Sequence, residues 1–397
     1  MIHRLYLLIL FLAPLFMPFA AGAQTRNYER FAAGENHYLV LMADGTLWSL
    51  GKNQYGQLGD GTTTDRQQPV KILSNVKSIA CGSNHSLAVL NDGSLYAWGW
   101  NDCGQLGDGT TTPHEKPVKI LSNVKSMDCG TTHSMAVLND GSLWAWGSNT
   151  FGQLGDGTTT DRHSPVKILD NVQSVSCGWG HTMAVLNDGT LYAWGANNSR
   201  QLGLGFNSRE LMPTPKSRPV KTGTGIRMAA YGGNHSLILT VNGTVYSCGS
   251  NEKGQLGIGD VIGNISKTPV LSNVKSIAAG GNHSMAILSD GSLYVWGDNC
   301  EGQIGNGTTL NQFVPMKVFE NVSAVSCGNF YTMAILNDGT LYAWGDNNAS
   351  QLGDDSNIDR FVPVRTKTGV KRVACGHTNT MYIDNEGDLN VVGKLFW

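Results

Sequence analysis

The sequence predicts an all-β fold, a β-propeller of four-stranded antiparallel blades. Three observations lead to this prediction: a fixed repeat, one tight turn in every repeat, and short apolar runs on both sides of each turn. Trp98, Trp146 and Trp194 are 48 residues apart, and Trp296 and Trp344 resume the same spacing. About 48 residues for four short strands that stack on their neighbours is typical of a propeller blade. A parallel β-helix has shorter rungs and would lack the turns.

The turn of each repeat ends in glycine, and in seven of the eight copies it reads Asp-Gly or Asn-Gly. These dipeptides favour the two-residue turn of a β-hairpin. The eight turns are Asp44-Gly45, Asp92-Gly93, Asp140-Gly141, Asp188-Gly189, Asn242-Gly243, Asp290-Gly291, Asp338-Gly339 and Glu386-Gly387.

Each hairpin joins two runs such as Ser86–Leu90 and Leu95–Trp98. The runs are too short for helices and apolar at successive positions, which is typical of strands buried on both faces. Segments equivalent to Pro69–Ile72 and Val76–Ile79 complete the four strands of a repeat.

The first 23 residues differ from the rest of the chain. A basic head at His3 and Arg4 is followed by an apolar run to Ala20 and by Ala21-Gly22-Ala23. This order is typical of a secretory signal peptide, although the run is almost long enough for an uncleaved membrane anchor. We expect residues 1–23 to be a signal peptide and residues 24–397 a single propeller domain. The mature protein is then exported to the periplasm, cell surface or medium, with no membrane span.

Four motifs recur around the chain: Trp-Gly-x-Asn, Gly-Gln-Leu-Gly-x-Gly, Pro-Val and Gly-x-x-His. With them the sequence resembles the regulator of chromosome condensation repeat family over almost all of the mature chain. The resemblance implies a propeller, typically of seven blades. The sequence itself holds seven full repeats and a partial eighth, so counting favours eight blades. In an eight-bladed ring we expect the first blade to lack its Pro-Val strand.

Composition and motifs argue against several kinds of chemistry. The formal net charge is −2, with 28 basic and 30 acidic residues, which gives no basic stripe for nucleic acid. The Gly-Gln-Leu-Gly loops are not followed by the helix that a phosphate site needs, and they recur as scaffold elements would. No candidate nucleophile or base departs from the repeat. We therefore expect a protein that is not an enzyme, with no catalytic residue, cofactor or metal.

One histidine and one cysteine recur at fixed positions of the repeat. Equivalent residues of neighbouring blades lie about 10 Å apart, too far to share a zinc ion or to form a disulfide. We expect structural hydrogen bonds from the histidines, small buried cysteines and no structural disulfide. The histidines are His37, His85, His133, His181, His235 and His283, and the cysteines are Cys81, Cys129, Cys177, Cys327 and Cys375.

Large aromatic residues occupy loop positions that the scaffold leaves free. The Gly-x-x-His and Gly-x-Asn loops are expected on one face, because both are connected to the hairpin at the end opposite the turn. Aromatic residues are enriched in protein interfaces, although packing between blades is the alternative for them. The candidate partner-binding residues are Tyr55, Trp100, Phe151, Trp179, Phe330 and Tyr331.

These observations predict an exported, monomeric interaction module that binds an unidentified protein through this loop face. The family resemblance implies two alternatives, guanine-nucleotide exchange on a small GTPase and ultraviolet sensing by clustered tryptophans. Carbohydrate binding through the aromatic residues is a third. The repeat position of Trp98, Trp146, Trp194, Trp296 and Trp344 favours a core role over light sensing.

Overall fold

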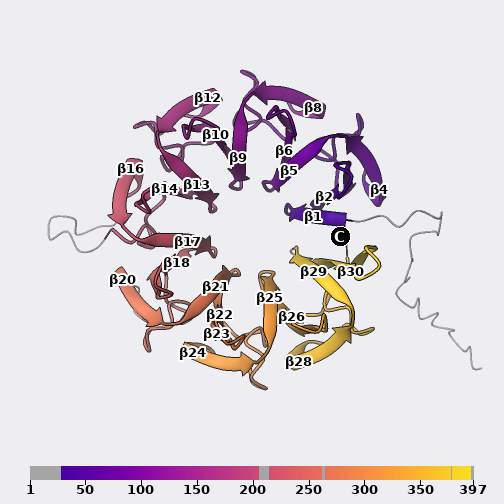
Figure 1. Ribbon diagram of the computed structural model, residues 1–397, viewed down its shortest axis with the longest axis vertical. Helices are drawn as coiled ribbons and strands as arrows, with labels where there is room; N and C mark the ends of the chain where they lie inside the picture. The colour runs from indigo at the N-terminus through magenta and orange to yellow at the C-terminus, as the bar shows by residue number, and fades with distance from the viewer. Residues whose placement is uncertain (1–27, 205–213, 262–263, 377, 395–397) are drawn as a thin grey trace, which may run out of the picture.

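The computed structural model describes residues 28–204, 214–261, 264–376 and 378–394. All regular elements in these ranges are β-strands, and they form eight antiparallel sheets arranged as the blades of a ring around a central channel (Figure 1). The predicted propeller is confirmed, with eight blades rather than seven. Within the described ranges, no element is a helix long and apolar enough to cross a membrane.

Each blade is built from consecutive strands, running from the channel outward. The innermost strands are β1 (Tyr28–Ala33), β5 (Val76–Cys81), β9 (Val124–Cys129), β13 (Val172–Cys177), β17 (Ile226–Tyr231), β21 (Val274–Ala279), β25 (Val322–Cys327) and β29 (Val370–Cys375). The second strands are β2 (His37–Met42), β6 (His85–Leu90), β10 (His133–Leu138), β14 (His181–Leu186), β18 (His235–Thr240), β22 (His283–Leu288), β26 (Tyr331–Leu336) and β30 (Asn379–Asp384).

The third strands follow the hairpin turns. They are β3 (Leu47–Gly51), β7 (Leu95–Gly99), β11 (Leu143–Gly147), β15 (Leu191–Gly195), β19 (Val245–Gly249), β23 (Leu293–Gly297), β27 (Leu341–Gly345) and β31 (Leu389–Gly393). The outermost strands are β4 (Arg66–Leu73), β8 (His114–Leu121), β12 (Arg162–Leu169), β16 (Lys216–Gly223), β20 (Asn264–Leu271), β24 (Gln312–Phe319) and β28 (Arg360–Lys367).

The incomplete blade is the last one, and the prediction that the first blade lacks its Pro-Val strand is wrong. Pro69 and Val70 lie on β4, which pairs with β3 and completes the first blade. The Pro-Val strand therefore ends a blade instead of beginning one. Among the described residues, the last sheet contains only β29, β30 and β31.

The second strands are buried at almost every position, as the continuous apolar runs predict. Each face packs against a neighbouring blade, so that one apolar cluster lies between each pair of blades. Between the second and third blades, for example, Leu87 and Val89 contact a cluster that includes Trp146. The core is thus a ring of blade interfaces around the channel.

The ring closes by packing of side chains between the first and last blades. Val40 and Leu50 of the first blade form one buried cluster with Met381 and Ile383 of the last. Their innermost strands, β1 and β29, lie side by side in the ring (Figure 1). No strand is exchanged across this seam among the described elements, because every sheet is contiguous in sequence.

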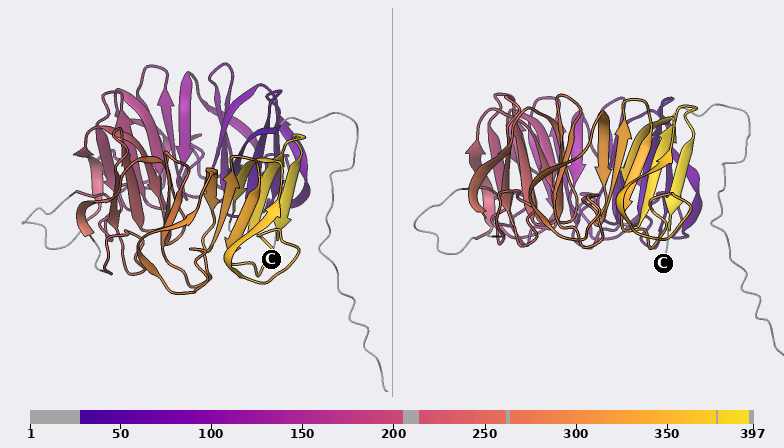
Figure 2. Two further views of the ribbon diagram at one scale, coloured as in Figure 1. Left: turned by 60° about the horizontal axis from the view of Figure 1, so that its bottom comes forward. Right: turned by 90° about the horizontal axis from the view of Figure 1, so that it is seen from below.

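The antiparallel pairing places two sets of connections on each face of the disc. Strands stand roughly parallel to the channel axis when the ring is seen from the side (Figure 2). The connections between first and second strands, residues 82–84 in the second blade, therefore share one face with the long loops between third and fourth strands, residues 100–113. We call this side the loop face. It carries both the Gly-x-x-His and the Gly-x-Asn loops, as predicted.

Candidate functional site

Two buried amides organise each long loop of the loop face. In the first blade, the Asn53 amide donates to the carbonyl oxygens of Thr62 and Thr64, and its Oδ1 accepts the backbone N–H of Leu58. The Gln57 side chain accepts the N–H of Tyr55 at 2.9 Å. Both amides are fully buried. They hold the loop tip, and with it residue 55, in one conformation.

The repeated tryptophan joins each blade to the long loop of the preceding blade. Trp98 is fully buried, and its indole N–H donates to the Gln57 carbonyl oxygen at 2.9 Å. Gly59 has a φ of +78°, and a Cβ at this position would lie 2.7 Å from the Trp98 indole nitrogen. Glycine is required both by the backbone conformation and by the close approach of the ring. The Gly-Gln-Leu-Gly motif is therefore structural, as predicted.

The repeated histidines form a second set of links between blades. The Nε2 atoms of His37, His85 and His133 lie 2.9, 3.0 and 3.2 Å from a hydroxyl of the next blade. That hydroxyl, Ser86 for His37, already donates its single proton to a buried carbonyl oxygen. The imidazole must then donate from Nε2, which fixes the neutral tautomer. His235 and His283 make the same link, so the structural role predicted for these five is confirmed.

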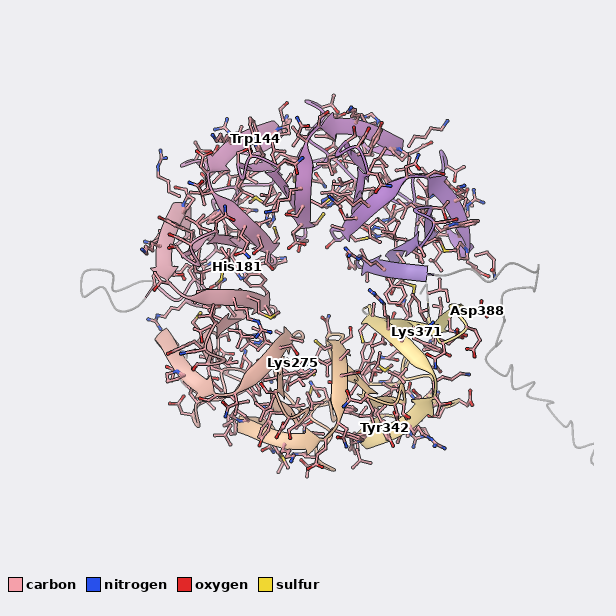
Figure 3. The ribbon with its side chains drawn as sticks, viewed as in Figure 1. Trp144, His181, Lys275, Tyr342, Lys371 and Asp388 are labelled. Carbon is pink, nitrogen blue, oxygen red and sulfur yellow. The ribbon has the colours of Figure 1, made fainter. Side chains whose placement is uncertain are left out.

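His181 is the exception among the repeated histidines. Instead of a hydroxyl partner it has the ring of Tyr231, which meets it edge to face at 4.7 Å between ring centroids. His181 lies between two blades and not in the channel (Figure 3). Tyr231 occupies the position where most other blades carry cysteine, and this bulkier residue explains the local change.

Burial sets the ionisation of both repeated residue types. Desolvation lowers the pKa of His37, His181 and His283 to about 4, and that of His85, His133 and His235 to about 3. Burial also raises the pKa of the Cys129 and Cys177 thiols well above the ordinary value. At neutral pH the imidazoles are uncharged and the thiols protonated, which suits scaffold residues and disfavours nucleophilic chemistry.

Four of the six predicted aromatic residues form two pairs on the loop face. Tyr55 of the first blade lies 5.7 Å from Trp100 of the second, between ring centroids, and Phe151 of the third lies 5.4 Å from Trp179 of the fourth. Trp179 is 56% exposed, whereas Tyr55, Trp100 and Phe151 are half-buried. We call these four residues the aromatic arc. Each pair bridges two blades of the loop face, on which all four residues lie.

The remaining two candidates separate. Phe330 is 38% exposed on the loop face of the seventh blade, apart from the four-residue arc. Tyr331 is fully buried, so its assignment to the partner-binding surface is wrong. It occupies the histidine position at the start of β26, and its hydroxyl lies 2.5 Å from the Asn379 carbonyl oxygen of the last blade. Tyr331 replaces the histidine link and belongs to the scaffold.

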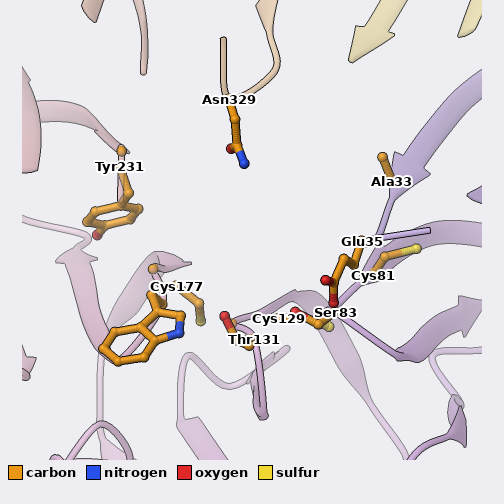
Figure 4. A pocket seen from close by; sticks show the side chains of 15 residues that line it. Ala33, Glu35, Cys81, Ser83, Cys129, Thr131, Cys177, Tyr231 and Asn329 are labelled. Atoms are coloured by element: carbon orange, nitrogen blue, oxygen red, sulfur yellow. The ribbon is translucent and has the colours of Figure 1, made fainter. Parts of the chain in front are cut away.

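The sequence reasoning missed the cavity at the mouth of the channel. A cavity of about 440 Å³ opens there, lined by the ends of the innermost strands and the residues that follow them. Polar side chains of Glu35, Ser83, Thr131 and Asn329 line it, and Trp179 of the aromatic arc belongs to the same wall (Figure 4). All five occupy the first variable position of Gly-x-x-His. Aligning that position across the repeats would have found them.

Hydrogen bonds between neighbouring loops hold the mouth of the channel together. The N–H of Glu35 donates to the Ser83 carbonyl oxygen at 3.1 Å, and the N–H of Ser83 to that of Thr131 at 3.2 Å. Backbone bonds of this kind fix the loops of adjacent blades relative to each other. The loop face thus combines a rigid backbone, a polar cavity and exposed aromatic rings, an arrangement suited to binding a ligand without conformational change.

Among the residues that the structure describes, no group of three or more histidine, cysteine or acidic side chains is arranged to hold a metal ion. Apart from His181, the repeated histidines bind hydroxyl groups of the next blade through Nε2, which argues against their use as metal ligands.

Comparisons with known proteins agree with this architecture. A family model for the RCC1-like domain matches residues 14–262 and 207–395. Yeast RCC1 (Prp20) with bound Kap60 aligns with a TM-score of 0.66 at 24% identity, over 87% of this chain and 88% of that one. Human WBSCR16 aligns with a TM-score of 0.67 at 21% identity, over 88% and 99%. At these identities the two structures support the fold alone.

One sequence relative was also found. The human X-linked retinitis pigmentosa GTPase regulator is 39% identical over 57 residues, which cover 14% of this chain and 6% of that protein. The matched segment is about the size of one blade, so it supports the repeat and carries nothing about the activity of the whole relative.

Proposed function

The chain belongs to the RCC1-like domain family, and from this premise we propose that it is a non-enzymatic interaction module that binds a protein partner through the aromatic arc and the channel mouth. The aromatic arc carries the proposal. Pairs of large rings on adjacent blades, held by buried amides, present rigid contact area at little entropic cost.

The absence of catalysis is part of this proposal. Repeated histidines such as His85 bind hydroxyl groups of the next blade, and burial keeps both the histidines and the inner-strand cysteines uncharged at neutral pH. The Glu35 carboxylate at the channel mouth is exposed. In the described part of the cavity lining, it makes no hydrogen bond to a serine, threonine or cysteine side chain. Such a surface is suited to recognition.

Related structures favour a protein as the ligand. Yeast RCC1 (Prp20) has been crystallised with Kap60, and its binding to Gsp1p and histones has been studied. These partners belong to the yeast protein. For the present chain they support only the general use of such a propeller as a protein-binding surface.

We also propose that the protein is exported, on the strength of the leader-like residues 1–23. Intact-mass measurement of protein from the culture medium or cell envelope is the test. A mass that corresponds to a start at Gln24 is expected, and a mass that retains Met1–Ala23 contradicts cleavage.

The binding proposal is tested by affinity capture from extracellular and envelope extracts. Wild-type protein is compared with the double variant Trp100→Ala/Trp179→Ala, and captured proteins are identified by mass spectrometry. A partner held by wild type and lost by the variant is expected. Trp144→Ala is the matched control, because the Trp144 indole N–H donates to Ser142 beside the hairpin turn, at the end of the blade opposite the loop face.

The same variants separate the alternatives. Binding on a glycan array that disappears in Trp100→Ala/Trp179→Ala would make the aromatic arc a carbohydrate site. Accelerated nucleotide release from a GTPase would favour an exchange factor. Equal capture by wild type, the double variant and Trp144→Ala would overturn the use of the arc.

A further inference from the structure

The outermost strands of the sixth and seventh blades depart from those of the first four in the same way. In blades one to four, the second and third residues of the outermost strand are polar. In blades six and seven, the same two positions are Phe and Val. The polar residues are Gln67 and Gln68, Glu115 and Lys116, His163 and Ser164, and Ser217 and Arg218; their counterparts are Phe313 and Val314, and Phe361 and Val362.

A third position changes in parallel. Two residues before the outermost strand, blades one to four carry threonine, at Thr64, Thr112, Thr160 and Thr214, whereas blades six and seven carry Leu310 and Ile358. The main chain is the same in both versions. The amide of Asn299 binds the Leu310 carbonyl oxygen just as that of Asn53 binds the Thr64 carbonyl oxygen. The fold therefore does not require an apolar side chain at these sites.

The apolar side chains lie on the surface of the ring. Leu310, Phe313, Val314, Met316, Ile358, Phe361 and Val362 are between 36% and 71% exposed, and we call them the rim patch. Their strands, β24 and β28, lie at the outer edge of neighbouring blades (Figure 1). Three of these positions are equivalent on the two adjacent blades, and Met316 adds a fourth on the sixth blade, so exposed apolar side chains are concentrated on this part of the outer edge.

The rim patch rests on a rigid base. Phe313 packs over Gly254 and Phe361 over Gly302, each in the long loop of the preceding blade. The carbonyl oxygens of the same two residues accept the N–H groups of Gly259 and Gly307, both at 2.7 Å. Because the rings are held against backbone, their outer edges stay in place, and the surface is organised before it meets a partner.

The area of the rim patch suits a dimer. Its residues are half exposed on average, and with areas of about 200 Å² per large residue they present roughly 700 Å² of surface. This exceeds the largest apolar patch of most monomers, about 300–600 Å². Covered by an identical patch, it would bury roughly 1,400 Å² in total, within the range of stable interfaces.

The charges beside the rim patch favour a second copy over a highly charged partner. Lys317 pairs with Glu320 at 2.6 Å, and Arg360 pairs with Asp354 at 2.5 Å. Both signs are thus present at the patch, so two copies related by a two-fold axis meet without a surplus of like charges. Strand addition is not the mode of contact, because Pro315 and Pro363 interrupt the hydrogen-bonding edges of β24 and β28.

We propose that the protein forms a two-fold symmetric homodimer through the rim patch of its sixth and seventh blades. The contact joins the two rings at their outer edges. The aromatic arc belongs to blades one to four, so both copies keep it free for a partner. The dimer goes beyond the interaction function proposed above and replaces the sequence-based expectation of a monomer, which took no account of these outer strands.

Sedimentation equilibrium of the purified protein tests the proposal. The test variant carries Leu310→Thr, Val314→Lys, Ile358→Thr and Val362→Arg, which install residues that the first four blades already hold at these positions. Wild type is expected to be a dimer at micromolar concentration, and the variant is expected to raise the dissociation constant by about 100-fold or more. Thermal unfolding of both proteins verifies that the variant is folded.

Val241→Asn is the control. Val241 is a lone exposed apolar residue in the turn of the fifth blade, where five of the other seven repeats carry asparagine, and it lies outside the rim patch. This variant is expected to dimerise as wild type does. A wild-type protein that stays monomeric up to about 100 µM, or a dimer that the fourfold variant retains, overturns the proposal. Wild-type monomers that bind phospholipid vesicles through the patch would likewise overturn it and identify a membrane-facing surface.

Discussion

Trp146 and Trp179 belong to adjacent blades, but one lies in a blade interface and the other on the loop face. Trp146 lies at a blade interface, fully buried, with its indole N–H bound to the Gln105 carbonyl oxygen. Trp179 stands on the loop face beside the channel mouth, more than half exposed, with one face against Phe151. The first recurs as tryptophan at five of the eight blade interfaces, with Leu50, Cys248 and Val392 at the other three, and the second has no tryptophan counterpart in the other repeats.

The difference teaches how a repeat protein divides its sequence. Positions that recur maintain the blade interfaces, because each blade must meet the next one in the same way. Positions that vary lie where the scaffold makes no demand, and only there can a surface acquire a particular use. The following predictions test this division, beginning with the largest effect.

Acid is expected to unfold the ring by protonating the histidines that are buried between the blades. The six buried histidines have pKa values of about 3 to 4 in the folded protein, below the ordinary 6.5. The unfolded chain therefore binds protons first, and stability that is complete above pH 6.5 is lost as the pH falls toward 4. All six shifts have the same sign and act in the same pH range, so we expect the protein to unfold as the pH approaches 4. Urea unfolding at a series of pH values measures this.

Asp128 acts in the opposite direction over the same range. Burial raises its pKa to about 6, so it takes up a proton in the folded protein before it does so in the unfolded chain. Asp128→Asn is expected to raise stability at pH 7 and to leave the acid transition in place. For the wild-type protein, a free energy of unfolding that stays constant from pH 6.5 to pH 4 would contradict the prediction that histidine protonation unfolds the ring.

Trp146→Ala is expected to reduce the free energy of unfolding by about 3–5 kcal/mol, because it removes a large buried ring and one of the two hydrogen bonds that the Gln105 carbonyl oxygen accepts, the other being from Ser134. Chemical denaturation measures the loss. The comparison is Trp179→Ala, for which a change below about 1 kcal/mol is expected. Equal losses would show that the loop-face ring is part of the packing.

Trp100→Ala and Trp179→Ala are each expected to weaken binding of the captured partner by about 2 kcal/mol, since each removes a ring from the aromatic arc. Calorimetry or surface plasmon resonance gives the affinities, with Trp144→Ala as the control. Unchanged affinity in both variants would move the binding surface elsewhere on the propeller.

Arg162→Ala is expected to have the smallest effect. Its guanidinium lies 2.6 Å from the Asp156 carboxylate in the long loop of the third blade, and the arginine is partly exposed. We expect a loss of about 0.5–1 kcal/mol at low salt that shrinks as ionic strength rises. A larger loss that is independent of salt would contradict the assignment of this ion pair to the solvent-screened surface.

Much of the fold could be predicted from the sequence, because its physical determinants repeat. The Asp-Gly turns, the doubly buried second strands and the tryptophan spacing each state a local requirement that recurs with every blade. The error about the incomplete blade has a physical cause. The Pro-Val segment pairs with the strand before it, and spacing alone cannot distinguish this from pairing with the strand after it.

The candidate site was less predictable for the same reason. A variable aromatic residue gives no sequence signal of its burial, so Trp179 and Tyr331 looked alike, although one is exposed and the other fills a histidine position. The cavity at the channel mouth is lined by residues of six blades. The repeat alignment identifies Glu35, Ser83 and Asn329 as equivalent, but only the ring places them around one opening.

The construction of each blade from consecutive strands has a consequence for how such rings gain or lose blades. Because each sheet is contiguous, the short link at Ser122 and Asn123 between β8 and β9 joins two complete structural units. Cutting the chain there and joining the present ends would leave every sheet whole, so a circular permutant of this kind should be tolerated. By the same logic, duplication of one such unit in the gene inserts a finished blade, and a ring can gain or lose members without any intermediate that contains half a sheet.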